Sequence, residues 1–196
     1  MSGNRLPLLL ASASPRRQEL LRQMGVPFTV RPSQADETLS GTETPREAVL
    51  TLSRRKALAA ARLHPGRFVL GADTLVSLDG KAFGKPVTQE QAAETLRLLS
   101  GRTHQVFTGV TVVSPEGKTF SAVDRSDVTF CPVPEEEILA YVAGGEPMDK
   151  AGSYAIQGGA ALWVTRLEGS PSSVIGLPLH LVRELLLRAG YPLTGC

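Results

Sequence analysis

Two arginines, Arg16 and Arg17, follow directly on Ser14-Pro15, where an apolar strand gives way to a helix. Ser is a favoured N-cap and Pro a favoured first helical residue, so this pattern predicts a helix opening at residue 15. A helix N-terminus has free N–H groups and partial positive charge, so two arginines there make sense if an anion binds. The amides, the Ser hydroxyls and both guanidinium groups can together grip phosphate. The alternative is that both arginines point into solvent.

Asp73 and Glu37 are the acids with the clearest chemical use. Asp73 lies in Gly71-Ala72-Asp73-Thr74, between strand-like runs at 68–70 and 74–78, near a glycine that permits sharp backbone geometry. An acid in this position can hold Mg²⁺, orient a water, or stabilise a turn. Glu37 lies in a polar loop, where it is either solvated or completes a Mg²⁺ site with Asp73.

Lys56 falls on the inward stripe of a helix predicted over 45–63. The other members of that stripe are Val49, Leu52, Ala59 and Leu63. A lysine there either extends its amine to solvent or meets an anion, and the sequence leaves both open. Lys85, in Gly84-Lys85-Pro86, supplies another cation after a predicted hairpin. This segment is not a P-loop, because proline replaces the Ser or Thr that would hold Mg²⁺.

The segment from Glu146 to Gln157 is dense in polar side chains and glycine. Gln157 can read the edge of a base through its amide. Asp149 and Lys150 can instead form a structural ion pair. His104 stands at the start of a strand without a second histidine at ligand spacing, so we predict a structural histidine.

The elements that must position these residues alternate between strands and helices. Strands are predicted at 8–11, 28–31, 68–70, 74–78, 106–113, 119–130 and 161–167. Helices are predicted at 15–24, 45–63, 134–142 and 179–189, with another opened by Thr88 and closed by Gly101. Strand–helix alternation combined with long hairpins predicts an α/β fold, a mixed twisted sheet flanked by helices.

Composition narrows the class of protein. The 196 residues include 42% hydrophobic and 20% charged residues, which fits a single globular domain over residues 1–196. A net charge of +2 and 5% aromatic residues argue against nucleic-acid binding. The apolar patch at 6–11 is too short for a signal peptide or a membrane span, so we expect a cytoplasmic protein. Cys131 and Cys196 are expected to be reduced thiols.

The polar motifs occur in a specific order along nearly the whole chain. In sequence they are Ser12-x-Ser14-Pro15-Arg16-Arg17, Glu37, Lys56, Gly71-Ala72-Asp73-Thr74, Gly84-Lys85-Pro86, Ser100-Gly101-x-x-His104, Glu146-Pro147-x-Asp149-Lys150-Ala151-Gly152, Ile156-Gln157-Gly158 and Gly176-Leu177-Pro178. This series, from about residue 7 to 190, resembles the Maf family.

The resemblance implies a nucleoside triphosphate pyrophosphatase that depends on a divalent metal, Mg or Mn, and often forms homodimers. It implies two lobes around a cleft, with a fold like that of the inosine triphosphate pyrophosphatases. By the family's pattern, Asp73 is the catalytic acid and Glu37 an acid near the metal. The residues that match its phosphate-handling positions are Arg16, Arg17, Lys56 and Lys85. Ser14 is a further expected substrate-binding residue.

The motifs resemble those of the branch that acts on dTTP and UTP. In that branch, the positions matched here by Arg16, Thr74 and Gln157 mark substrate choice. One departure is the stretch Gly169-Ser170-Pro171-Ser172-Ser173, where family members often carry an aromatic residue and an Asn. Any contact made by that Asn is therefore absent from this chain.

Two functions from different classes fit these residues. In the first, the chain cleaves nucleoside triphosphates to clean nucleotide pools, with a link to arrest of cell division. In the second, it is a regulatory nucleotide-binding protein of septum formation without significant turnover. Two acids facing a polyanion favour the enzyme, because a pure binder gains nothing from them unless a metal intervenes.

Overall fold

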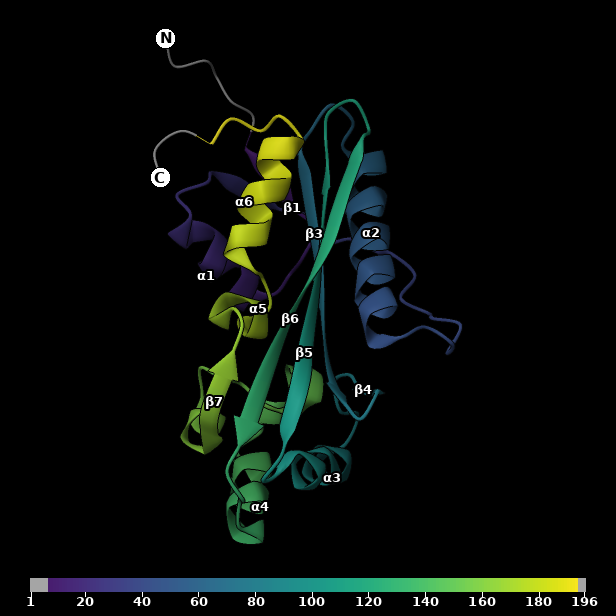
Figure 1. Cartoon of the computed structure of the whole chain (residues 1–196). Helices are drawn as coiled ribbons and strands as arrows, with labels where there is room; N and C mark the ends of the chain where they lie inside the picture. The colour runs from purple at the N-terminus through teal and green to yellow at the C-terminus, as the bar shows by residue number, and fades with distance from the viewer. Residues whose placement is uncertain (1–6, 194–196) are drawn as a thin grey trace.

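The computed structural model describes residues 7–193 and builds them around a seven-stranded mixed sheet (Figure 1). The strands are β1 (Leu8–Leu10), β2 (Phe28–Val30), β3 (Val69–Leu78), β4 (Lys81–Phe83), β5 (Thr103–Val113), β6 (Thr119–Phe130) and β7 (Val164–Glu168). Their order is β2-β1-β3-β5-β6-β7, and β4 pairs with the far end of β3. Strands β2, β1 and β3 are parallel and the remaining pairs antiparallel, which confirms the predicted mixed sheet.

Helices cover both faces of this sheet. They are α1 (Pro15–Gln23), α2 (Pro45–Leu63), α3 (Gln89–Leu99), α4 (Glu135–Ala143), α5 (Pro171–Ile175) and α6 (Leu179–Arg188), with short 3₁₀ helices η1 (Glu146–Asp149), η2 (Ala151–Ser153) and η3 (Gly159–Trp163). Helix α2 lies on one face, α1, α5 and α6 lie on the other, and α3 and α4 close the far end of the long strands (Figure 1).

The predicted helix starts are confirmed by their caps. Ser14 accepts a hydrogen bond from the Arg17 N–H, and Pro15 is the first residue of α1. Thr44 and Glu47 form a complete capping box at the start of α2, where each side chain accepts the backbone N–H of the other. Such caps satisfy N–H groups that have no partner within the helix, and so fix where α1 and α2 begin.

The prediction of two separate strands at 68–70 and 74–78 is wrong. One strand, β3, runs straight through Gly71. A Cβ on Gly71 would lie 2.6 Å from the Ser53 carbonyl oxygen, and one on Gly109 would lie 2.3 Å from the Val49 carbonyl oxygen. Both glycines therefore let α2 rest directly on β3 and β5, which brings the Lys56 side chain over the middle of β3.

The strand predicted over 161–167 is also wrong in its first half. Residues 159–163 instead form η3, at the end of which Trp163 is buried among hydrophobic side chains. Strand β7 begins only at Val164. Helix α5 has no counterpart in the prediction, and Leu63, assigned to the inward stripe of α2, is 72% exposed.

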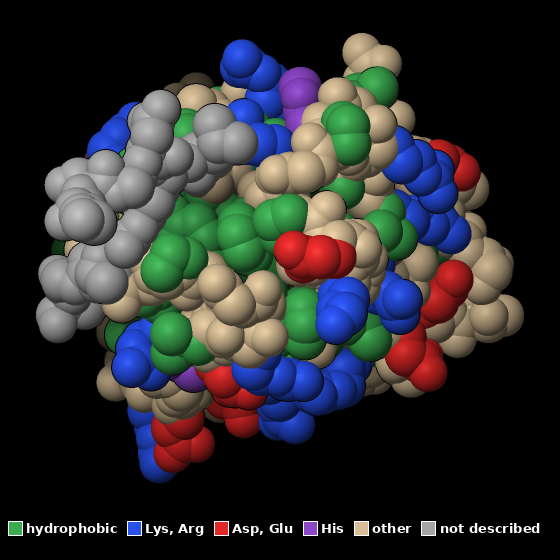
Figure 2. All heavy atoms as spheres, turned by 90° about the horizontal axis from the view of Figure 1, so that it is seen from above, with side chains coloured by type: hydrophobic (Ala, Val, Ile, Leu, Met, Phe, Trp, Pro, Cys, Tyr) green, Lys and Arg blue, Asp and Glu red, His purple; other side chains and the backbone are tan. Residues whose placement is uncertain are grey.

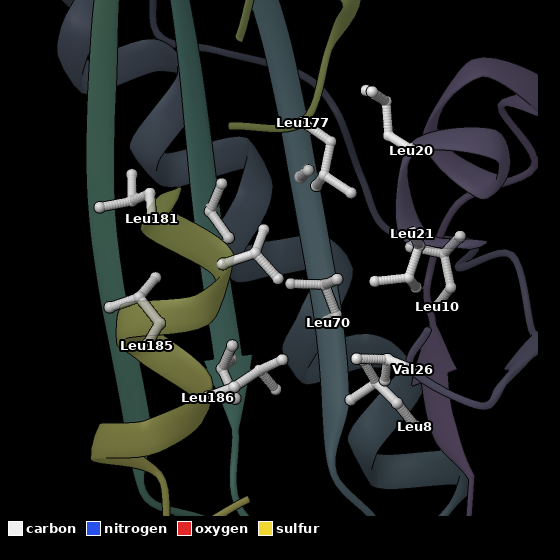
Figure 3. Close-up of a cluster of buried hydrophobic side chains, with 14 of the residues drawn as sticks. Leu8, Leu10, Leu20, Leu21, Val26, Leu70, Leu177, Leu181, Leu185 and Leu186 are labelled. Atoms are coloured by element: carbon white, nitrogen blue, oxygen red, sulfur yellow. The ribbon is translucent and has the colours of Figure 1, made fainter. Parts of the chain in front are cut away.

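The long strands join two hydrophobic clusters. In the upper cluster, Leu181, Leu185 and Leu186 of α6 face Leu70 of β3 across the sheet surface, with leucines of β1 and α1 beyond them (Figure 3). The lower cluster gathers α3, α4 and η3 around β5 and β6, and includes Val76, Phe130 and Trp163. Cys131, at its edge, is a free thiol as predicted, while Cys196 lies outside the described residues.

His104 is a structural histidine, as predicted. Its ring is fully buried in the lower cluster, where its Nε2 lies 2.8 Å from the Tyr154 hydroxyl and its edge meets Phe130. Its Nδ1 has no hydrogen-bond partner among residues 7–193. Burial lowers the pKa of His104 from 6.5 to about 4, although the nearby charge of Asp127 opposes that shift.

This pKa predicts acid sensitivity. The unfolded chain takes up a proton near pH 6.5, whereas the folded chain resists it until about pH 4. The contribution of His104 to the free energy of unfolding should therefore fall by about 3 kcal/mol in total as the pH drops through this window. Above pH 6.5 this contribution should be constant. Urea unfolding of wild type and His104→Gln at pH 7 and pH 5 measures the effect. The wild type should lose more stability, and equal losses would contradict the assignment.

Candidate active site

A pocket of about 460 Å³ opens beside the exposed edge of β3. All nine residues that the sequence singled out for the site line it, although they come from segments far apart in the chain. They are Ser14, Arg16, Arg17, Glu37, Lys56, Asp73, Thr74, Lys85 and Gln157. The structure therefore brings the sequence-predicted set together in one place.

The pocket exists because β3 lacks a partner along part of one edge. Strand β1 pairs with β3 only at residues 69–70, and β4 pairs with it only at 76–78. Between these two contacts the edge opens onto the cavity, with Asp73 in the gap. On its other edge β3 is paired with β5 from residue 69 to 77, which holds the open segment rigidly.

Lys56 bridges the two acids. Its Nζ lies 2.6 Å from Asp73 Oδ1 and 2.9 Å from Glu37 Oε2. The side chains of Lys56 and Asp73 are each 13% exposed, whereas that of Glu37 is 59% exposed. The sequence left open whether the Lys56 amine extends to solvent or meets an anion, and in the structure it meets two carboxylates. Within residues 7–193, no hydrogen bond or ion pair engages Asp73 Oδ2, which remains available as an acceptor.

The loop that carries Glu37 is tied down by the same helix. Arg55, next to Lys56 on α2, donates from its Nη1 to the Asp36 carbonyl at 3.2 Å and to the Thr38 carbonyl at 2.5 Å. These two bonds grip the backbone on either side of Glu37. Helix α2 therefore supplies both the cation between the acids and the anchor for the more exposed acid.

Arg17 lines the pocket and does not point into solvent, because its guanidinium is held by three hydrogen bonds. Its Nε donates to the Gly176 carbonyl at 2.8 Å, its Nη1 to Ser12 Oγ at 3.2 Å and its Nη2 to Thr74 Oγ1 at 3.1 Å. Burial lowers the pKa of Arg17, and the charge of Asp73 opposes the shift. Arg17 stays protonated at neutral pH and connects α1, β3 and the turn after α5.

Ser12 becomes a hydrogen-bond donor through this arrangement. Its Oγ accepts from Arg17 Nη1 at 3.2 Å and from the Ser14 N–H at 3.3 Å, which uses both lone pairs. The hydroxyl proton is then free to donate to an anion at the start of α1. The free N–H groups of the first helical turn lie in the same region.

Arg16 is the less restrained arginine of the pair. Its side chain is 33% exposed, and Nη1 lies 3.4 Å from Asp149 Oδ2. Asp149 also receives a hydrogen bond from Lys150 Nζ at 2.6 Å, so the predicted ion pair is present. Burial raises the pKa of Asp149, but the Lys150 hydrogen bond and the charges of Lys150 and Arg16 outweigh it and lower the pKa overall.

The backbone around Gln157 is held by a hydrogen-bond network from Tyr141 of α4 and Glu146 of η1. The Tyr141 hydroxyl donates to Glu146 Oε1 at 3.1 Å and accepts from the Ala155 N–H at 3.1 Å. Glu146 Oε2 accepts from the Gly159 N–H at 3.2 Å. These bonds fix the backbone on both sides of Gln157, whose own side chain is exposed.

The pocket lining also includes apolar residues, here called the apolar part, that sequence reasoning missed. They are Val76, Val106, Tyr154, Ile156, Val174 and Ile175. Val76 and Val106 are direct cross-strand partners on β3 and β5, three residues along β3 from Asp73. Alternation along β3 could have identified Val76, but the other residues come from separate elements that only the fold brings together.

Charge in the pocket favours anions. Its lining includes the cations Arg16, Arg17, Lys56, Lys85 and Lys150 and the carboxylates Glu37, Asp73 and Asp149. A polyanion can therefore be neutralised at the polar part while an apolar ring enters the other part. A metal is compatible with Glu37 and Asp73, because both already converge on one positive charge.

On the face of the molecule shown in Figure 2, positively charged side chains are not gathered in this way. There, Asp and Glu side chains lie among the Lys and Arg side chains that surround a central group of hydrophobic residues (Figure 2). Within residues 7–193, no helix is both long and apolar enough to cross a lipid bilayer.

This chain is similar in sequence to proteins of a known family. A family model described as Maf-like protein matches residues 7–189. A dTTP/UTP pyrophosphatase of Bacillus mycoides is 49% identical over 179 residues, which cover 91% of this chain and 93% of the relative. A dTTP/UTP pyrophosphatase of Symbiobacterium thermophilum is 48% identical over 189 residues, covering 96% of this chain and 97% of the relative.

Among solved structures, a HAM1 protein from Coxiella burnetii aligns with a TM-score of 0.52 and 14% identity. The alignment covers 94% of this chain and all of the other chain (100%), so the two share their fold. The predicted α/β architecture is thereby confirmed. With a family model matching almost its entire length and two relatives near half identity, the chain belongs to the Maf family.

Proposed function

We propose that this chain hydrolyses dTTP and UTP to the nucleoside monophosphate and pyrophosphate. The observation that carries the proposal is the pocket itself, whose lining combines Asp73 with several cations and a set of apolar side chains. The names of the two relatives support the same reaction and the same nucleotides.

The polar part of the pocket suits a triphosphate. Arg16, Lys85 and the start of α1 line it, and Ser12 has a hydroxyl proton free for a phosphate oxygen. Ser12 and the N–H groups of α1 are held in place by the fold before substrate arrives, so they need little reorganisation as negative charge moves onto the leaving pyrophosphate, while Arg16 and Lys85 add positive charge. We assign phosphate positioning to these groups.

Asp73 is the residue that we assign to the attacking water. Lys56 occupies Oδ1, so the remaining oxygen, Oδ2, can accept a hydrogen bond from a water and draw its proton away. The strand pairing of β3 with β5 holds Asp73 in place. Attack on the α-phosphorus then releases pyrophosphate.

A divalent cation, Mg or Mn, fits the two acids. Within residues 7–193 no cluster of three or more His, Cys, Asp or Glu side chains is arranged around a common point, so Glu37 and Asp73 would hold the ion with help from substrate phosphates. Such an ion would supply neutralisation of phosphate charge and polarise the phosphoryl oxygens. Lys56 keeps the two carboxylates together when no substrate is bound.

The base is assigned to the apolar part of the pocket. Val76, Val106 and Ile156 offer apolar contact to a pyrimidine ring. Thr74 and Gln157 are polar side chains of the same lining, and we propose that they choose the base together with Arg16. Homodimer formation and a cytoplasmic location, which the family resemblance and the sequence predict, remain proposals.

A panel of nucleotides tests this function. Pyrophosphate release should be detected with dTTP and UTP in the presence of Mg²⁺ or Mn²⁺, should be much weaker with GTP and ATP, and should fall to background with EDTA. The control is the same panel with Asp73→Asn. Binding of dTTP without pyrophosphate release under any metal would instead favour the regulatory nucleotide-binding protein.

A further inference from the structure

A row of hydroxyl groups runs beneath the pocket from Thr74 to the backbone of α5. Thr108 Oγ1 donates to the Ser173 carbonyl oxygen at 2.8 Å. Thr74 Oγ1 lies 3.0 Å from Thr108 Oγ1, and Arg17 Nη2 donates to Thr74 Oγ1 at 3.1 Å. Thr108 and Ser173 are completely buried, whereas Thr74 reaches the pocket wall.

Counting protons fixes the direction of every bond in this row. A threonine hydroxyl has one proton and two lone pairs. The proton of Thr108 is used on the Ser173 carbonyl, which is an acceptor only. The bond between the two threonines must therefore be donated by Thr74. Because Arg17 fills one lone pair of Thr74, a single lone pair is left to face the pocket.

We propose that Thr108 is a positioning residue that turns Thr74 into a hydrogen-bond acceptor, and that the site thereby selects bases with an N–H at ring position 3. The inference rests on the proposed function and sharpens it. Thymine and uracil have an N3–H donor, whereas cytosine has an unprotonated N3 acceptor in the same place. An acceptor facing cytosine N3 leaves two lone pairs opposed, which costs binding energy.

The same count of protons and lone pairs explains why Thr74 alone could not discriminate between uracil and cytosine. A hydroxyl that is free to rotate can serve a donor or an acceptor equally well, so it discriminates poorly between uracil and cytosine. Buried Thr108 removes that freedom, and it does so without touching the nucleotide. Arg17 contributes from the other side, and it also sets Ser12 as a donor toward phosphate.

Thr108→Val tests the proposal, because valine keeps the shape and removes the hydroxyl. Thr74 can then donate into the pocket, so the ratio of kcat/KM for UTP to that for CTP should fall about tenfold. Thr108→Ser retains the hydroxyl and should restore the ratio. The matched control is Thr111→Val, a buried threonine on the same strand that bonds Ser53 and Ser121 away from the pocket.

A pH profile gives a readout that a loss of stability would not produce. The N3–H of 5-fluorouracil is more acidic than that of uracil, so kcat/KM for 5-fluoro-UTP should decline at a lower pH than kcat/KM for UTP in the wild type. In Thr108→Val the gap between the two profiles should narrow, because Thr74 can also donate to a deprotonated N3.

The outcomes separate the two claims. If wild type releases no pyrophosphate from any nucleotide, the proposed function fails. If wild type hydrolyses UTP but Thr108→Val and Thr111→Val keep the same UTP to CTP ratio, the function stands and the role of Thr108 is overturned. A ratio that falls in Thr108→Val alone, with the pH gap narrowed, supports it.

Discussion

Asp73→Asn should lower kcat for dTTP and UTP by on the order of 10²–10⁴. Asparagine has nearly the same shape, but its amide cannot take a proton from water and it holds a metal poorly. The loss should appear mainly in kcat, because Arg16, Lys85 and the start of α1 still bind the triphosphate. Steady-state kinetics measured as pyrophosphate release give both constants.

The control for this variant is Asp36→Asn. Asp36 lies in the exposed loop beside Glu37, where its Oδ1 accepts the Thr38 N–H at 2.9 Å, and asparagine can keep that bond. Asp36 is not among the residues that line the pocket. Turnover by Asp36→Asn should stay close to wild type. Near-normal turnover by Asp73→Asn would remove Asp73 from the chemistry.

Lys56→Met should also reduce kcat/KM strongly, by on the order of 10². Methionine preserves most of the apolar stem that packs on β3 but removes the ammonium between Asp73 and Glu37. The two carboxylates then repel each other, and the cation that positions Asp73 is lost. The same kinetic assay measures the effect, and circular dichroism verifies that the fold is retained.

Arg54→Met provides the comparison for Lys56→Met. Arg54 is exposed on the same helix and is outside the pocket lining, so the substitution removes one positive charge without touching the acids. Any fall in rate caused only by a change in overall charge would appear in both variants. Equal kinetics for Lys56→Met and Arg54→Met would contradict the bridging role.

Local signals made much of the fold predictable. The caps at Ser14 and Thr44 fixed two helix starts, because they satisfy N–H groups that water or side chains must otherwise serve. The hairpin predicted before Lys85, which β4 makes with β3, is indicated by Asp79-Gly80, a residue pair typical of hairpin turns. Lys56 was placed on the inward side of α2 by helical spacing alone.

Contacts between distant segments could not be read from the chain. Gly71 was noted only as a residue that permits sharp backbone geometry, whereas it allows α2 to approach β3, and only the crossing of helix and strand reveals this. The sequence marked Arg17 for phosphate, but it could not show the bonds to Ser12, Thr74 and Gly176, which come from three parts of the chain.

Residues without chemical signals were missed for the same reason. Thr108 looks like any strand threonine, and its use depends on the Ser173 carbonyl sixty-five positions away. The apolar part of the pocket likewise combines Val106 of β5 with Ile156 and Ile175, which no local pattern relates. The charged side chains of the pocket could be identified in the sequence. The apolar residues assigned to the base are brought together only by tertiary packing.

Hydrolysis in water enriched in oxygen-18 tests the central claim most directly, because it reports which phosphorus is attacked. A water directed by Asp73 onto the α-phosphorus should place the label in the nucleoside monophosphate and leave the pyrophosphate unlabelled. Mass spectrometry of the products from UTP distinguishes the two. Label in the pyrophosphate, or release of UDP with labelled phosphate, would contradict the account.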